Sequence, residues 1–167
     1  MKLIYGLLSA SLLASAVVSA DTAKIAFPGE YKSTFTNYLS LDRTLNADQT
    51  IRLFANETAM QGADADGKLP YGSVLVAEIY KAKKDADGNV IVSSLDRRLR
   101  GDFALIAVME RREGFNEGIP AALQNDDWDF ATFTPAGEPA KKDLNTCRAC
   151  HAPLTSSNHL FSYDHLK

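Results

Sequence analysis

The chain has 167 residues, of which 46% are hydrophobic and 23% are charged, and its formal net charge at pH 7 is −3. Charges of both signs are mixed along the chain, and together with the negative net charge this indicates no nucleic-acid partner. The length is sufficient for one hydrophobic core, and the sequence contains neither an internal repeat nor a low-complexity tract.

The first 20 residues have the pattern of a secretory signal peptide. Met1 and Lys2 form a short cationic start, residues 3–18 carry no charge, and small residues follow up to Ala20. We therefore expect cleavage after residues 1–20, export to the periplasm, and a single mature domain over residues 21–167. An uncleaved anchor is the alternative, although the apolar run is short for a membrane span. The mature part is expected to have no membrane span.

The first half of the mature chain has short strand-like runs separated by turns. Residues 31–41 alternate between two sides, and residues 50–55 form a second, shorter candidate strand. Asn56 is placed to cap a brief helix that runs to Met60 and ends before Gly62. Residues 63–68 read as a polar loop.

The second half continues the same pattern. Residues 73–84 and 89–95 flank the sequence "DADG", which predicts a hairpin. Residues 102–111 form an apolar strand, Pro120 can open a short helix that ends near residue 124, and residues 128–134 form an aromatic strand. Short strands joined by turn residues predict a mainly β fold, an antiparallel sheet with a few short helices.

The sequence "CRACH" at residues 147–151 contains both cysteines of the chain. A disulfide between Cys147 and Cys150 would close a very small loop and contribute little stability. A thioredoxin-like redox pair would require a βαβ context, which the sequence does not show. A zinc site could recruit His159 and His165, but that would leave the position of His151 unexplained.

Cys-x-x-Cys-His is the attachment signature of a c-type haem. Cys147 and Cys150 would form the covalent bonds to one haem, and His151 would be the axial ligand of its iron. Combined with the signal peptide, this motif predicts an exported cytochrome c.

Several segments besides the haem motif resemble one family. They are "FPGEY", "TIRLF", "KLPYGSVLVAEI", "DWDFATFTPAGEP", and "CRACHAP" followed by "LFSY". In this order they are similar to the cytochrome P-460 and cytochrome c′-beta family over nearly the whole mature chain. The resemblance implies a largely antiparallel β fold, a homodimer, and a five-coordinate haem with His151 proximal. The open distal side would bind small molecules such as NO, CO or hydroxylamine.

Ala77 separates this chain from one branch of that family. The hydroxylamine-oxidising branch carries, at the corresponding strand position, a lysine that is cross-linked to the haem. A methyl group cannot form this bond, so the resemblance is closer to the c′-beta branch. Lys81 is a weak substitute because it lies four residues further along the strand.

The candidates for the distal pocket are Arg52, Phe54 and Ala77. Arg52 could polarise a bound ligand or could be a solvated strand residue, and Phe54 could cap the iron or belong to the core. Glu78 is expected to point to the opposite face from Ala77 and to accept structural hydrogen bonds. A six-coordinate iron would need Met60, Met109, His159 or His165 as its second axial ligand.

Three functions remain open at this point. The first is a cytochrome that binds NO or CO, for capture, sensing or detoxification. The second is an enzyme, an oxidoreductase acting on hydroxylamine or NO. The third is a six-coordinate electron carrier, and each of them could exchange electrons with a partner cytochrome.

Overall fold

The structure, a computed structural model, describes residues 24–167. The predicted signal peptide therefore lies outside the described residues. The main element is an antiparallel sheet of five strands in the order β1-β2-β3-β4-β5, which confirms the predicted fold class. The strands are β1 (Thr36–Asp42), β2 (Gln49–Ala55), β3 (Val74–Ala82), β4 (Arg100–Arg111) and β5 (Trp128–Phe133).

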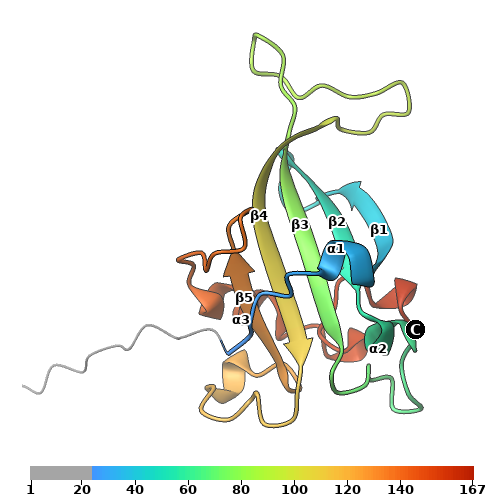
Figure 1. The fold of residues 1–167 in the computed structure, drawn as a ribbon, viewed down its shortest axis with the longest axis vertical. Helices are drawn as coiled ribbons and strands as arrows, with labels where there is room; N and C mark the ends of the chain where they lie inside the picture. The colour runs from blue at the N-terminus through green and yellow to red at the C-terminus, as the bar shows by residue number, and fades with distance from the viewer. Residues whose placement is uncertain (1–23) are drawn as a thin grey trace, which may run out of the picture.

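Short helices lie on both sides of this sheet (Figure 1). They are α1 (Tyr31–Thr34), α2 (Glu57–Met60) and α3 (Leu144–His151), with 3₁₀-helices η1 (Ala121–Leu123), η2 (Thr155–Ser157) and η3 (Tyr163–His165). Within residues 24–167, no helix combines the length and the hydropathy that crossing a membrane would require.

Local sequence signals placed several of these elements correctly. The Asn56 side chain caps α2 by accepting a hydrogen bond of 3.0 Å from the Ala59 amide. Gly62 follows this helix with a φ of 85°, a conformation that costs glycine little. Pro120 precedes η1, and the strands predicted at residues 102–111 and 128–134 correspond to β4 and β5.

Two strand predictions are wrong in part. Residues 31–34 form α1, because the Phe35 amide donates to the Tyr31 carbonyl at 2.9 Å, and the strand begins only at Thr36. The "DADG" turn forms, but residues 89–95 make only isolated bridges, and β3 pairs with β4 instead. This segment projects beyond the sheet (Figure 1), where Leu95 is 82% exposed. The alternating apolar residues of this segment are not buried against a core, so their pattern does not correspond to a strand of the sheet.

The register divides the strand residues between two faces. Each face contains rows of side chains that cross the sheet from strand to strand, because successive residues point to opposite sides. One row on the first face is Arg52–Glu78–Ile106–Phe133, and one row on the second face is Leu39–Leu53–Ala77–Ala107–Thr132. α1 and the N-terminal segment cover the first face, and the C-terminal segment with α3 lies behind the sheet (Figure 1).

The first face is well packed. It buries an aromatic and aliphatic cluster made of Ile25, Tyr31, Phe54, Val76, Ile106, Val108, Phe115, Ala131 and Phe133. The fully buried carboxylate of Glu78 lies within this face and accepts hydrogen bonds of 2.8 Å from the hydroxyls of Tyr31 and Tyr80. Arg52 adds a 3.3 Å ion pair with the same carboxylate. Glu78 is thus the structural acceptor that the sequence predicted.

Replacement of Tyr31 by phenylalanine tests this network. Burial first, and then the hydrogen bond to Glu78, raise the pKa of Tyr31 far above its usual range. The folded protein therefore keeps a proton that the unfolded chain releases near pH 10, so the free energy of unfolding should fall as the pH rises above 10. Tyr31→Phe should lower stability at pH 8 by about 1.5–3 kcal/mol, the value of a hydrogen bond to a charged group. It should also flatten the alkaline decline.

Urea unfolding at pH 8, 10 and 11 measures both effects. Tyr71→Phe is the matched control, because the hydroxyl of Tyr71 donates to Asp127 at an exposed site. Equal alkaline declines in the wild type and Tyr31→Phe would contradict the assignment.

The second face is only partly covered. One part of this face packs against the C-terminal segment. The buried cluster there consists of Ala55, Ala59, Leu69, Leu75, Trp128, Leu160 and Leu166. Beyond this cluster, towards the middle of the strands, the apolar side chains remain half-buried. The fold therefore has one closed face and one face with apolar surface still available beside α3.

Candidate functional site

Helix α3 presents the three residues of the haem motif together. Asp143 caps its first turn, because the Asp143 carboxylate accepts a hydrogen bond of 3.0 Å from the Asn145 amide. In a helix, positions i, i+3 and i+4 lie on one side, so Cys147, Cys150 and His151 are neighbours. Cys147 and His151 are half-buried and Cys150 is exposed. The helix thus places two thiols and an imidazole at one edge of the sheet.

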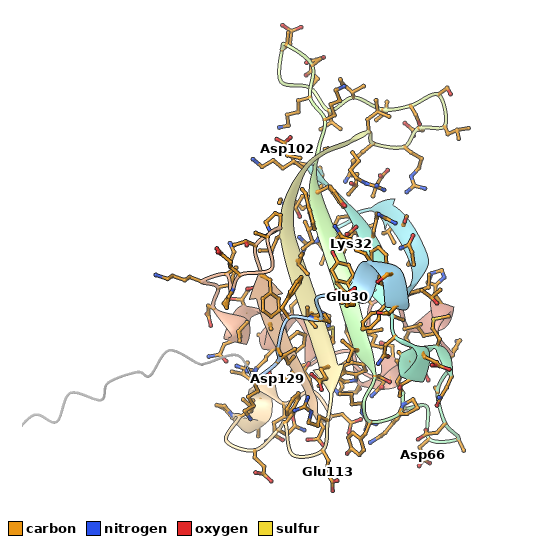
Figure 2. The ribbon with its side chains drawn as sticks, viewed as in Figure 1. Glu30, Lys32, Asp66, Asp102, Glu113 and Asp129 are labelled. Atoms are coloured by element: carbon orange, nitrogen blue, oxygen red, sulfur yellow. The ribbon has the colours of Figure 1, made fainter. Side chains whose placement is uncertain are left out.

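A buried ion pair fixes this helix to the edge strand β5. The Arg148 guanidinium donates from Nε and Nη2 to Oδ1 of Asp129, at 3.1 and 2.7 Å. Both side chains are almost completely buried, at 2% and 1% exposure. Figure 2 shows Asp129 on β5. Arg148 lies between the two cysteines in sequence, so its ion pair sets the position of the haem motif against the sheet.

Arg148→Met should destabilise the folded protein by about 3–5 kcal/mol, because it leaves the buried Asp129 carboxylate without its cation. Arg112→Met is the control: Arg112 pairs with Glu110 but its side chain is 56% exposed, so the expected loss is below about 1 kcal/mol. Chemical unfolding of both variants measures the difference. Similar losses for the two would show that the Arg148 pair does not anchor α3.

The imidazole of His151 is held in one orientation. Its Nδ1 lies 2.7 Å from the His159 carbonyl oxygen, so Nδ1 carries the proton and donates it. This leaves Nε2 without a hydrogen-bond partner among residues 24–167. The rings of Phe130 and Phe161 pack against the imidazole, each with its centroid 5.0 Å away. Burial lowers the pKa of His151, which keeps the ring neutral at pH 7.

The surroundings of the cysteines do not fit the alternative chemistries. Both residues are free thiols. Burial raises the pKa of the Cys147 thiol, whereas a redox-active cysteine requires a lowered pKa. Among the described residues, no three His, Cys, Asp or Glu side chains are grouped to hold a metal ion. The proposed zinc set with His159 and His165 is therefore not brought together.

The half-buried apolar part of the second face lies on the side of the sheet where Phe130 of β5 packs against His151. It is formed by two cross-strand rows, Leu39–Leu53–Ala77–Ala107 and Leu41–Ile51–Ile79–Leu105. All of these residues except Ile79 remain partly exposed, although six of the eight lie on the interior strands β2, β3 and β4. We name these eight residues the apolar platform. Ala77 occupies the central strand, and the methyl groups of Ala77 and Ala107 leave room above the platform.

The prediction that Arg52, Phe54 and Ala77 share one distal pocket is wrong. Arg52 pairs in register with Glu78 and Phe54 with Val76, so both side chains point to the face opposite Ala77. Phe54 is buried against Tyr31 with ring centroids 5.4 Å apart, and Arg52 is engaged with Glu78. The alternative readings, a core phenylalanine and a structural arginine, are the ones the structure supports. Only Ala77 lies on the platform.

No lysine replaces the missing one at Ala77 among residues 24–167. Lys81 is on the same strand and side, but four residues away, or roughly 13 Å along the strand. The ammonium group of Lys68 is already engaged, because it donates to Asp126 at 2.8 Å. The platform is therefore free of an amine near its centre.

The other predicted iron ligands are either packed or exposed, although Met109 shares the face of the platform, two residues along β4 from Ala107. Met109 packs against the buried cluster that contains Trp128 and Leu160. Met60 is 41% exposed on α2. His159 lies behind His151 and its own Nδ1 contacts the His151 carbonyl at 3.2 Å. His165 is exposed in η3.

The residues present fit a covalently attached haem. Two free thiols, an imidazole with a free Nε2, and an apolar platform on the same face of the sheet are the donor set and the surface that such a group requires. Sequence reasoning missed Leu39, Leu53 and Ala107 as well as the His159 carbonyl. The strand alternation could have identified the first three, because they share the parity of Ala77.

Comparison with known proteins agrees with this site. Nothing among the curated proteins matches the chain. The family model described as Cytochrome P460 matches residues 28–162, which include every strand, the haem motif and His159. On this match, which spans most of the molecule, the chain belongs to the cytochrome P460 family, whose members are c-type cytochromes with a haem cofactor.

Proposed function

We propose that this protein is an exported, periplasmic cytochrome with one haem c that binds uncharged diatomic molecules, NO and CO. Cys147 and Cys150 would hold the haem covalently, and His151 would supply the imidazole ligand to its iron. The physiological role is the capture, sensing or detoxification of NO. The resemblance to the c′-beta branch further supports a homodimer, and a partner cytochrome would supply or accept electrons.

The apolar platform is the observation that carries this proposal. Its eight residues offer no amine, imidazole, thioether or hydroxyl above the sheet. When bound, the haem supplies an iron with one coordination position that the protein leaves unfilled. An apolar surface excludes water and favours small neutral ligands over polar or charged ones.

The chain's own residues have separate tasks in this site. His151 presents Nε2, because its Nδ1 proton is committed to the His159 carbonyl at 2.7 Å. Phe130 and Phe161 restrict rotation of the imidazole. Arg148 and Asp129 fix the helix, and the methyl groups of Ala77 and Ala107 keep space for a ligand.

Two observations argue against the other functions. Ala77 lacks the nitrogen with which the hydroxylamine-oxidising branch cross-links its haem. An electron carrier with six-coordinate iron would need a thioether or imidazole free on the face of the platform, whereas Met109, which lies on that face, packs against the cluster of Trp128 and Leu160.

Optical spectra of the ferrous protein, with and without CO or NO, test the proposal. We expect a five-coordinate high-spin spectrum that becomes six-coordinate when CO is added. A low-spin ferrous spectrum that CO leaves unchanged would contradict the proposal and favour an electron carrier.

Ala77→Leu supplies a matched test of the platform. Overpacking typically costs about 1–3 kcal/mol, and 1.4 kcal/mol corresponds to a factor of ten in affinity. We therefore expect CO affinity to fall by roughly tenfold or more. Ala86→Leu is the control, because Ala86 is exposed in the turn that projects from the sheet. Unchanged CO affinity in Ala77→Leu would show that the ligand does not bind above the platform.

A further inference from the structure

The carbonyl group that orients His151 belongs to an unusual turn. Asn158 and His159 are consecutive residues in the left-handed region, with φ angles of 46° and 61°. This conformation is uncommon for residues other than glycine and is tolerated best by asparagine and aspartate. The turn follows η2 and directs the His159 carbonyl towards Nδ1 of His151. The left-handed conformation of this turn requires a restraint from neighbouring residues, because such a conformation persists only where the surroundings enforce it.

The side chain of Asn158 provides this restraint. It is 4% exposed, and both ends of its amide are engaged. Its Oδ1 accepts a hydrogen bond of 2.9 Å from the Leu69 amide, and its Nδ2 donates to Oδ2 of Asp126 at 3.1 Å. Asn158 thereby ties the turn to two segments that are distant in sequence.

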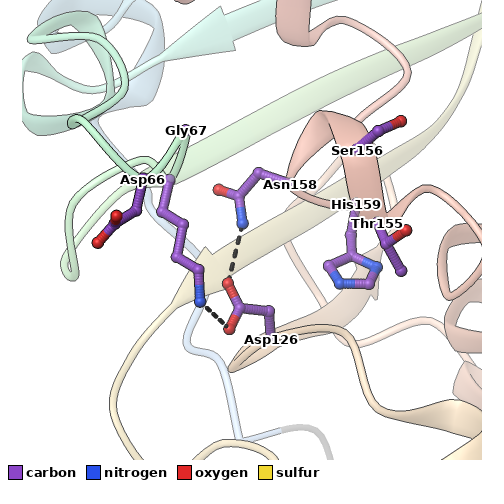
Figure 3. A pocket seen from close by; sticks show the side chains of 8 residues that line it. Asp66, Gly67, Asp126, Thr155, Ser156, Asn158 and His159 are labelled. Atoms are coloured by element: carbon purple, nitrogen blue, oxygen red, sulfur yellow. Dashed lines mark hydrogen bonds and ion pairs between the residues drawn. The ribbon is translucent and has the colours of Figure 1, made fainter.

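Asp126 is itself fixed by two cations. Nη2 of Arg111 lies 3.1 Å from its Oδ2, and Nζ of Lys68 lies 2.8 Å from its Oδ1. Figure 3 shows the hydrogen bond between Asn158 and Asp126. Arg111 also donates to the Leu69 carbonyl at 2.6 Å. The contacts form a continuous chain from Arg111 through Asp126 and Asn158 to the turn. We name this chain of contacts the carbonyl clamp.

We propose that the carbonyl clamp, with Asn158 at its centre, tunes the axial bond of His151. A firmly placed His159 carbonyl strengthens the hydrogen bond from Nδ1–H and makes Nε2 a better electron donor to iron. Stronger donation lowers the reduction potential of the haem. Asn158 is thus a positioning residue, which acts through the His159 carbonyl. This inference rests on the proposed ligation by His151.

Asn158→Gly separates the side chain from the backbone. Glycine adopts the left-handed conformation at little cost, so only the two side-chain hydrogen bonds are lost. In the holoprotein we expect the iron–histidine stretching frequency of the ferrous state to fall and the midpoint potential to rise. Asp126→Asn keeps Asn158 but weakens the ion pairs behind it, and should shift both quantities in the same direction by a smaller amount. This second variant keeps the test valid if the first does not fold.

Ser156→Ala is the control, because Ser156 lines the same pocket as Asp126 and is exposed. It should leave both quantities at their wild-type values. Wild-type frequency and potential in Asn158→Gly would overturn the inference while leaving the proposed function intact. A wild-type protein without histidine-ligated haem would instead overturn the proposed function.

Discussion

Replacing Cys147 and Cys150 together by alanine is expected to give an exported, folded protein without covalent haem. The physical reason is that the two thiols are the groups that would form the thioether bonds, and neither lies in the hydrophobic core: Cys147 is half-buried and Cys150 is exposed. Acid–acetone extraction followed by intact-protein mass spectrometry measures the result. Haem that remains with the double variant after extraction would disprove the attachment.

His151→Ala separates attachment from ligation. We expect the variant to retain covalent haem through the two cysteines but to lose the five-coordinate, histidine-ligated spectrum. His165→Ala is the control, because His165 is exposed in η3 and should leave the spectrum unchanged. An unchanged spectrum in His151→Ala would assign the axial bond to another histidine.

Another large expected effect is the near absence of hydroxylamine oxidation. We expect the protein to have an ordinary red c-type haem and to oxidise hydroxylamine slowly or not at all. Ala77 has no nitrogen to bond to the macrocycle, and its row neighbours Leu53 and Ala107 are apolar. Such a surface stabilises a neutral diatomic ligand better than a polar substrate. A pyridine haemochrome assay beside a steady-state hydroxylamine assay measures both properties.

A green protein with an abnormal haemochrome and sustained turnover would contradict this expectation. The cross-link would then have to come from Lys81 or Lys68. Lys81→Ala and Lys68→Ala would identify the cross-linking lysine, because only the replacement of that lysine should restore an ordinary haemochrome. Lys68→Ala has an additional consequence, because it removes one of the two cations that hold Asp126.

The strands were predictable to the extent that local pattern and burial agree. The apolar runs of β3, β4 and β5 were identified because each of them faces a core on at least one side. The strand predicted at residues 89–95 was wrong because the apolar residues there are not buried against a core. Val92 and Leu95 are 50% and 82% exposed. Tyr31 misled for the opposite reason: it is buried, but from a helical turn that docks on the sheet and not from a strand.

The candidate site shows the same division between local and long-range information. Cys147, Cys150 and His151 are close in sequence, so any helix would bring them together. The error at Arg52 and Phe54 arose because proximity to the haem was assigned by motif, without applying the register. Ala77 pairs with Leu53, and a shift of one residue sends a side chain to the other face.

The sequence by itself determined the mainly β architecture and predicted the chemistry of attachment, because both depend on short-range patterns: the alternation of apolar residues and a five-residue motif. The tertiary structure decided which face of the sheet carries the apolar platform and what orients the imidazole of His151. Arg148 and Asp129 are 19 positions apart in the sequence, and Leu69 and Asn158 are 89 positions apart, yet each pair is hydrogen-bonded. Contacts of this kind follow from the packing of the C-terminal segment on the sheet, and no local spacing encodes them.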